Sequence, residues 1–277
     1  MYEFKLNKQS ELPYCKNGWR GLVAERWSEL LSDYEAWQRE NPGEIVVAYR
    51  SRQGRRVETE LGRLYVKKIL ALTDASMSGR APISFLKWVL RPSRALAAWR
   101  ISQQLLQSGF HCARPVLAIR KRNALGYPHD VFITEDVQAK ALDELFANMN
   151  VGEKTQLADL LGTELARLHQ AGFVHGDCIM RNLCLDKDNN LIYLDNDRSK
   201  KTGLGVPFAR SLRNLAQLGY SARRTGADAE FVRLMYNTYA EVANWTQQQQ
   251  KNRIEKLEAG IEKRLELRRL ADLRKQN

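Results

Sequence analysis

The sequence has few cysteines and no long apolar run, and both shortages restrict the class of protein. The four cysteines in 277 residues include no CxxC pair, so they fit a reducing compartment better than a disulfide framework. No stretch approaches the ~20 apolar residues needed to span a bilayer. The first residues, MYEFKLNKQSEL, contain no apolar signal core. We therefore expect a soluble cytoplasmic protein, with peripheral contact at the inner membrane left open.

Acidic residues are outnumbered, and this imbalance indicates a negatively charged partner. The 44 lysines and arginines against 32 acidic residues give a net charge of +12 and a pI near 9.6. Nucleic acid, a phospholipid surface and a phosphorylated or acidic sugar all fit this charge, as does a basic face that contacts only solvent. Hydrophobic residues make up 44% of the chain, which predicts a globular protein with one bilobal unit or two small domains.

The stretch from Leu168 to Lys200 carries the most informative pattern. His175-Gly176-Asp177 follows a short apolar run, and Asn182 lies five positions after Asp177. Two short apolar strands come next, joined by a turn at 186–190 that is rich in Asp and Asn, and Asp195 follows the second strand. The pattern predicts a β-hairpin with polar residues beside its strand ends.

These polar residues suit phosphoryl transfer. The reaction needs a carboxylate that orients the attacking hydroxyl and accepts its proton, and Asp177 fits that role. It also needs hard oxygen ligands for Mg²⁺, which Asn182 and Asp195 supply. Asp197 is either a second metal contact or a turn cap. The competing interpretation is a plain hairpin whose Asp and Asn residues only cap turns, and the joint spacing argues against it.

The first 72 residues predict one helix and three strands. The apolar spacing predicts a helix over 19–40, strands over 45–49, 56–61 and 64–70, and a turn at 51–54. Lys67 and Lys68 lie in the third strand, where a lysine is costly unless it meets an anion. Neighbouring strand residues face opposite sides, so the two lysines compete for one role. On an exposed edge strand, both would be solvated.

Glycine is scarce in the first predicted hairpin loop, and glutamate is absent from a long stretch that follows. The loop RSRQGRR has one glycine and four arginines in place of GxGxxG, and its arginines are alternative phosphate contacts. No glutamate occurs between Arg80 and Val131, a range that contains a predicted helix over 93–108 capped by Ser93. The segment PISFLKWVLRP before it either packs on its own domain, which we favour, or touches a membrane interface.

The remaining chain is mainly helical. We predict strands over 115–121 and 131–134, and helices over 141–149, 153–170, 207–218, 228–245 and 247–275. The last helix is highly charged with few apolar positions. It is either a solvated basic helix or an arm for an anionic membrane or partner.

Several segments resemble the lipopolysaccharide kinases of the Kdo/WaaP family, in the protein-kinase-like superfamily. They are HGD followed by Asn182, GRLYVKK, AWRISQQLLQSGF, FITEDVQAKALDELF and LDNDR. HGD with this asparagine also occurs in aminoglycoside and choline kinases. The resemblance implies an α+β, bilobal protein-kinase-like fold, with a β-rich lobe at 1–136 and a mainly helical catalytic lobe at 137–277.

The resemblance also implies cofactors and roles. ATP and Mg²⁺ would be bound, with Asp177 as base, Asn182 and Asp195 as metal ligands, Lys67 on the phosphates, and the backbone of Glu135 and Val137 on the adenine. The family's helix glutamate falls at Ala98 here, on a helix face shared with Ile101 and Leu105 that we therefore expect to pack as apolar core. Asn196 replaces an apolar residue in the LDND segment. Either Glu58 or Glu60 then holds Lys67, or catalysis is impaired.

The expected function is ATP-dependent phosphorylation of a sugar hydroxyl in the lipopolysaccharide inner core, on Kdo or heptose, at the cytoplasmic membrane face. An anionic glycolipid would be the partner, and no nucleic acid is expected. A small-molecule kinase is one alternative, although a cationic aminoglycoside would favour acidic walls. A catalytically impaired, nucleotide-binding regulator is the other.

Overall fold

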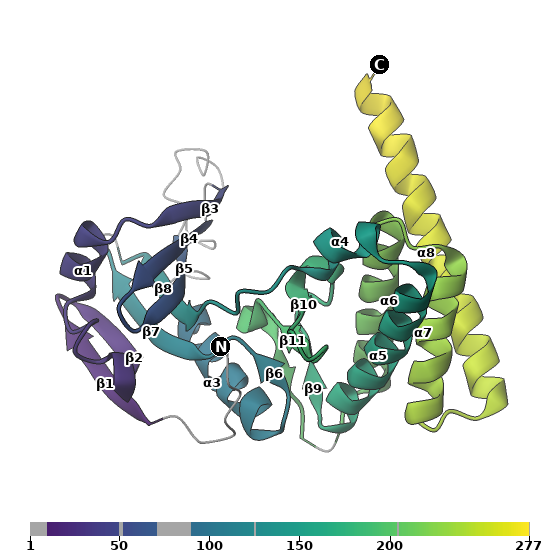
Figure 1. Cartoon of the computed structure of the whole chain (residues 1–277), viewed down its shortest axis with the longest axis horizontal. Helices are drawn as coiled ribbons and strands as arrows, with labels where there is room; N and C mark the ends of the chain where they lie inside the picture. The colour runs from purple at the N-terminus through teal and green to yellow at the C-terminus, as the bar shows by residue number, and fades with distance from the viewer. Residues whose placement is uncertain (1–9, 50–51, 71–89, 125, 204, 277) are drawn as a thin grey trace. The chain divides into compact units, whose positions relative to one another are not determined.

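The computed structural model describes residues 10–49, 52–70, 90–124, 126–203 and 205–276 (Figure 1). The chain divides into two compact units, Met1–Gln138 and Ala139–Asn277. The first is built on a β-sheet and the second is mainly helical, so the predicted α+β class is confirmed. Most of the segment PISFLKWVLRP lies outside the described residues.

Unit 1 is organised around a seven-stranded sheet in which every pair of neighbours is antiparallel. The strand order is β1-β2-β7-β8-β5-β4-β3. The strands are β1 (Glu11–Lys16), β2 (Trp19–Ala24), β3 (Glu44–Tyr49), β4 (Arg52–Thr59), β5 (Gly62–Leu70), β7 (Pro115–Arg122) and β8 (Pro128–Glu135). The same unit contains η1 (Glu25–Trp27), α1 (Tyr34–Glu40), α3 (Arg94–Gln107) and the short strand β6 (His111–Cys112).

The predicted helix over 19–40 is wrong. Strand β2, which forms a hairpin with β1, occupies its first part, and only Tyr34–Glu40 is an α-helix. Asn17 and Gly18 both have positive φ, 51° and 80°, which makes the tight turn that Asn-Gly favours between strands. Asp33 then caps α1 by accepting hydrogen bonds from two backbone amides. The apolar spacing thus came from a strand, a 3₁₀ turn and a short helix in succession.

The predicted turn at 51–54 is also wrong. β4 begins at Arg52, and Gly54 lies within it, paired with Lys67 of β5. The ladder between β4 and β5 runs without interruption from the Arg52–Ile69 pair to the Thr59–Gly62 pair. A side chain at Gly54 would meet the Tyr65 hydroxyl at 2.3 Å, so the glycine makes room for a tyrosine on β5.

Helix α3 forms as the sequence predicts. The Ser93 side chain accepts a hydrogen bond from the Leu96 amide, and Gly109 follows the helix with φ of 81°. The helix packs against β7 and β8. Ala98 is buried together with Ile101 and Leu105, so the prediction that this face is apolar core is confirmed.

Unit 2 is a group of helices around two short pairs of strands. The long helices are α5 (Val151–Gln170), α6 (Phe208–Arg224), α7 (Ala229–Val242) and α8 (Gln247–Gln276), with α4 (Leu142–Leu145) and η3 (Phe146–Asn148) before them. Asn150 and Glu153 form a capping box that starts α5. At Gly162, α5 approaches α7 so closely that an added Cβ would lie 2.5 Å from the Met235 carbonyl oxygen. Buried leucines of α5 provide much of this unit's core.

The strands of unit 2 carry the central motif. β10 (Leu183–Leu185) and β11 (Leu191–Tyr193) form the predicted hairpin, and β9 (Phe173–Val174) pairs with β12 (Lys200–Lys201). The 3₁₀ turns η4 (Met180–Asn182) and η5 (Asn196–Arg198) adjoin the hairpin. α8 begins in contact with α6 and α7, and its C-terminal part is exposed (Figure 1). None of the helices in the described ranges combines the length and apolar character needed to cross a bilayer.

Candidate active site

Asp177 and Asn182 lie at the two ends of one short loop in unit 2. The Asn182 amide nitrogen donates to the Asp177 carbonyl oxygen at 2.9 Å, and the Ile179 amide donates to the same oxygen at 3.0 Å. Asn182 is 8% exposed, and its Oδ1 remains to ligate a cation. Within the described residues, the Asp177 carboxylate accepts no hydrogen bond. It is half-buried and available to a substrate hydroxyl.

Asp195 follows the second strand in a left-handed conformation. Its φ and ψ are 54° and 51°, and such a conformation in a residue other than glycine costs about 1 kcal/mol or more. The preceding residue, Leu194, donates its amide to the Asn182 carbonyl oxygen at 2.9 Å. The strand pairing therefore places the segments of the two predicted metal ligands side by side.

His175 connects the segment of the predicted base to that of Asp195. Its Nε2 donates to the Leu194 carbonyl oxygen at 2.9 Å, and its Nδ1 accepts from the Asp177 amide at 3.3 Å. These partners require the neutral tautomer with the proton on Nε2. Burial lowers the pKa of His175, and the charges of Asp195 and Asp177 only partly oppose that effect. His175 is thus a neutral side chain that joins the segment of Asp177 to the segment of Asp195.

Asn214 of α6 fixes the backbone of His175. Its Oδ1 accepts from the His175 amide at 3.1 Å, and its Nδ2 donates to the His175 carbonyl oxygen at 2.8 Å. The same Oδ1 accepts from His169 Nε2 at 3.1 Å, while His169 Nδ1 accepts from the Tyr239 hydroxyl at 2.9 Å. Asn214 is 1% exposed and its hydrogen-bonding groups are all engaged, so the loop is held rigidly.

Gly176 is needed because the segment after Asp195 passes against it. A Cβ at Gly176 would lie 2.2 Å from the Arg198 Cβ and 2.3 Å from the Arg198 carbonyl carbon. The Gly176 amide donates to Ser199 Oγ at 3.1 Å, and Ser199 Oγ donates to Asn196 Oδ1 at 3.4 Å. The buried Asn196 side chain therefore accepts a hydrogen bond from Ser199, at a position where an apolar residue was expected from the resemblance.

Lys67 and Lys68 lie in unit 1 on opposite faces of the sheet. Lys67 is paired with Gly54 and Phe132, and Lys68 with Gln53 and Val131. Burial lowers the pKa of Lys68, and the nearby Arg55 lowers it further. The face of Lys67 is the one that contains Asp130, to which α3 is attached.

Glu135 and Val137, the predicted adenine contacts, lie at and just after the end of β8 in the same unit. The Glu135 amide donates to the Arg114 carbonyl oxygen and the Asp136 amide to the Arg63 carbonyl oxygen, each at 2.9 Å. Within the described residues, the Val137 amide donates to no backbone oxygen. That amide and the Glu135 carbonyl are the backbone groups that the resemblance assigns to the adenine.

Two of the four arginines proposed as phosphate contacts have structural partners. Arg55 donates to the Pro42 carbonyl oxygen at 2.7 Å, and Arg56 forms an ion pair with Asp136 at 3.3 Å. The glutamates proposed as partners of Lys67 do not suit that role. Glu58 forms an ion pair with Arg63. It lies four residues along β4 from Gly54, the residue opposite Lys67, which is a separation of about 13 Å.

The sequence of this chain is similar to known proteins. The model of the lipopolysaccharide kinase (Kdo/WaaP) family matches residues 37–253, most of the chain. The chain belongs to this family. A 3-deoxy-D-manno-octulosonic acid kinase of Vibrio vulnificus is 24% identical over 106 residues, covering 38% of this chain and 44% of the relative. One of Vibrio parahaemolyticus is 24% identical over 109 residues, or 39% and 45%. The matches thus span less than half of these curated relatives.

A solved structure shows the same fold. It is described as WaaP in complex with acyl carrier protein, and its TM-score to this chain is 0.57. The likeness covers 85% of this chain and 98% of the other at 18% sequence identity. The predicted resemblance to the Kdo/WaaP family is therefore confirmed by both sequence and fold.

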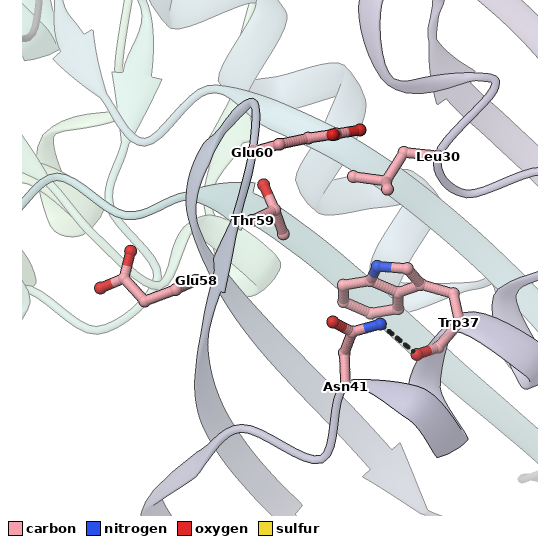
Figure 2. Close-up of a pocket in the computed structure, with 6 residues that line it drawn as sticks. All are labelled: Leu30, Trp37, Asn41, Glu58, Thr59 and Glu60. Atoms are coloured by element: carbon pink, nitrogen blue, oxygen red, sulfur yellow. Dashed lines mark hydrogen bonds between the residues drawn. The ribbon is translucent and has the colours of Figure 1, made fainter.

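A cavity of about 460 Å³ in unit 1 contains neither Lys67 nor the predicted base and metal ligands (Figure 2). It lies between α1 and the end of β4 and is lined by Leu30, Trp37, Asn41, Glu58, Thr59 and Glu60. Figure 2 shows the Asn41 amide bonded to the Trp37 carbonyl oxygen, which ends α1. The cavity lies where α1 packs beside the end of β4.

Three positioning residues were missed by the sequence analysis. Asn214 and Ser199 lie 37 and 22 positions after Asp177, and only the fold brings them to the loop. An aspartate within an apolar strand predicts a buried, paired carboxylate, and Asp130 carried this signal in the sequence. In the described part of the chain, no cluster of three His, Cys, Asp or Glu side chains forms a metal site. Asn182 and Asp195, the predicted metal ligands, are therefore not part of such a cluster.

Proposed function

We propose that this protein is an ATP-dependent kinase that phosphorylates a sugar hydroxyl of the lipopolysaccharide inner core, on Kdo or heptose. Its family and the names of its Vibrio relatives support the reaction class and the substrate class. The observation that carries the proposal is the hydrogen-bonded frame that joins Asp177, Asn182 and the segment before Asp195.

In this proposal, Asp177 orients the acceptor hydroxyl and takes its proton as the phosphoryl group transfers. Asn182 and Asp195 would hold Mg²⁺, which would neutralise the charge of the nucleotide phosphates. Lys67 binds the phosphates, and the Glu135 carbonyl and Val137 amide bind the adenine. Neutral His175 and Asn214 keep the base and the metal ligands in register.

The acceptor is proposed to be an anionic glycolipid, reached by peripheral contact with the cytoplasmic face of the inner membrane. The net charge of +12 supports an anionic partner. The exposed basic residues Arg198, Lys200 and Lys201 follow Asp195, and the Arg198 backbone lies against Gly176 beside the proposed base. This local charge favours an acidic sugar over a cationic aminoglycoside.

The decisive experiment compares lipopolysaccharide from three strains by mass spectrometry. One strain lacks the gene, one carries the wild-type gene, and one carries Asp177→Asn. We expect the first and third to lack one phosphate on a Kdo or heptose residue, and tandem fragmentation identifies the sugar. Identical core masses in all three would overturn the proposal, and turnover of choline or kanamycin by the purified protein would favour a small-molecule kinase.

A further inference from the structure

Asp130 is a buried carboxylate at which the sheet of unit 1 meets the start of α3. It is 4% exposed. Its Oδ1 accepts from Ser93 Oγ at 2.9 Å, and its Oδ2 accepts from the Arg94 amide at 3.0 Å. An anion at the N-terminus of a helix is stabilised by the free amides and the helix dipole. Asp130 therefore fastens the first turn of α3 to β8.

Arg120 of β7 completes the attachment. Its Nε donates to Asp130 Oδ1 at 2.7 Å and its Nη2 to Oδ2 at 3.0 Å, a bidentate pair between directly opposite strand residues. Arg120 also donates to the carbonyl oxygens of Arg91 and Pro92, at 2.6 and 3.1 Å. Asp130 and Arg120 thus hold both the first turn of α3 and the residues that lead into it.

The strand register places Asp130 next to Lys67. Asp130 is paired with Ile69, and Lys67 with Phe132, so the two side chains are diagonal neighbours on one face of the sheet. Diagonal neighbours lie about 7–8 Å apart at the backbone. The residue that fixes α3 is therefore also the residue whose charge lies beside the predicted phosphate-binding lysine.

We infer that Asp130 is a positioning residue that replaces the missing helix glutamate: it holds α3 and the Lys67 face of the sheet in the geometry for ATP. A glutamate on the helix would tie α3 to the lysine from the helix side. In this chain the helix carries Ala98, buried at 1% exposure, and the carboxylate comes from the sheet. This inference rests on the proposed function, because it assumes that Lys67 binds nucleotide.

The test is a double-mutant cycle in the full chain, with Mg²⁺–ATP affinity measured by calorimetry. Asp130→Asn keeps the size of the side chain but removes the charge that holds Arg120 and the helix start. We expect ATP affinity to fall about tenfold, since small misplacements in a site have effects of this order. We expect kcat at saturating ATP to change much less. In a Lys67→Ala background, the same substitution should have no further effect on ATP affinity.

Two further variants keep the test interpretable. Asp228→Ala removes a helix cap in unit 2, where Asp228 accepts from the Phe231 amide at 2.7 Å, and should lower Tm without changing ATP affinity. Arg120→Lys keeps the charge but loses the bidentate pair, and serves if Asp130→Asn fails to fold.

The outcomes separate the inference from the proposed function. If Asp130→Asn lowers Tm but binds ATP within twofold of wild type, Asp130 is only structural and the inference is wrong. Effects of Asp130→Asn and Lys67→Ala that multiply in the double variant also contradict it. A wild-type protein that binds no ATP would overturn the proposed function, and the inference with it.

Discussion

His175 Nε2 donates to the carbonyl oxygen of Leu194 at 2.9 Å, so one neutral imidazole joins the loop of the proposed base to the strand that ends before Asp195. Burial lowers the pKa of His175, and the charges of Asp195 and Asp177 oppose that effect only in part. The ring therefore joins the segment of Asp177 to the segment of Asp195 in its neutral form.

The first prediction concerns the base. Asp177→Asn should lower kcat by about 10²–10⁴-fold, because positioned proton acceptors contribute that much. Tm and ATP affinity should stay close to wild type, since the carboxylate accepts no hydrogen bond within the described residues. Phosphate transfer to a Kdo-containing acceptor, followed by mass spectrometry, measures the loss. A variant that turns over at the wild-type rate would show that another group is the base.

The second prediction concerns the metal. Asp195→Asn should weaken ATP binding in the presence of Mg²⁺ and leave metal-free binding nearly unchanged, because an amide oxygen is a poorer ligand than a carboxylate. Calorimetric titrations with and without Mg²⁺ measure the difference. Asp188→Asn is the matched control, because Asp188 lies in the exposed turn of the same hairpin. Equal metal dependence in wild type and Asp195→Asn would contradict the site.

The third prediction compares the two lysines. Lys67→Ala should weaken ATP binding about tenfold or more, and Lys68→Ala much less, because they face opposite sides of the sheet. Burial lowers the pKa of Lys68, which fits a lysine packed beside Arg55 rather than one facing phosphates. Equal losses would show that the strand register is wrong.

A glutamate introduced on α3 at position 98 should not increase turnover. Ala98→Glu places a charge among buried residues, which costs free energy unless Lys67 is within reach. We expect lower Tm and no increase in turnover. Increased activity would indicate instead that the usual ion-pair geometry survives and that Asp130 is not its replacement.

The fourth prediction concerns pH. Burial lowers the pKa of His169 to about 4 from 6.5, and the bond with Asn214 opposes this only in part. Below pH 6.5 the unfolded chain binds a proton that the folded chain does not, so stability is lost as pH falls from 6.5 towards 4. Between pH 7 and pH 5 the loss should be about 2 kcal/mol.

Urea unfolding at the two pH values tests this dependence. His175 contributes in the same direction, because its pKa is also lowered by burial. In His169→Gln, which does not titrate, the difference between pH 7 and pH 5 should be clearly smaller than in wild type. An equal difference in the two proteins would show that His169 is not responsible.

The sequence predicted the elements whose signals are local. The spacing of His175-Gly176-Asp177 and Asn182, the cap at Ser93 and the apolar face of Ala98 depend on residues close in the chain, and the structure contains each of them. The β1–β2 hairpin was missed although Asn17-Gly18 signals it, because bulky apolar residues at near-helical spacing outweighed the turn.

What the sequence could not predict depends on contacts between distant segments. Gly54 looks like a loop glycine, and only its pairing with Lys67 shows that it lies in a strand. The roles of Asn214 and Asp130 come from α6 packing on the loop and from β8 meeting α3. Neither packing has a periodic or spaced signature, because hydrogen bonds between elements depend on tertiary geometry.

The last prediction tests Asn214 as the support of the catalytic loop. Its amide makes four hydrogen bonds, two of them to the backbone of His175, at 1% exposure. Asn214→Leu keeps the approximate volume but leaves the amide and carbonyl of His175 and a nitrogen of His169 without partners. We expect a loss of about 2–3 kcal/mol in stability and at least a tenfold fall in kcat, with ATP affinity less affected.

Gln217→Ala is the matched control for Asn214. Gln217 accepts from Asn214 Nδ2 at 3.3 Å, so this variant removes the outermost bond and leaves the three bonds to the histidines intact. Its kcat should remain within about twofold of wild type. If Asn214→Leu lowers Tm but retains full kcat at a temperature where it is folded, the backbone of His175 is held by other contacts. In that case Asn214 stabilises the fold without positioning the proposed base.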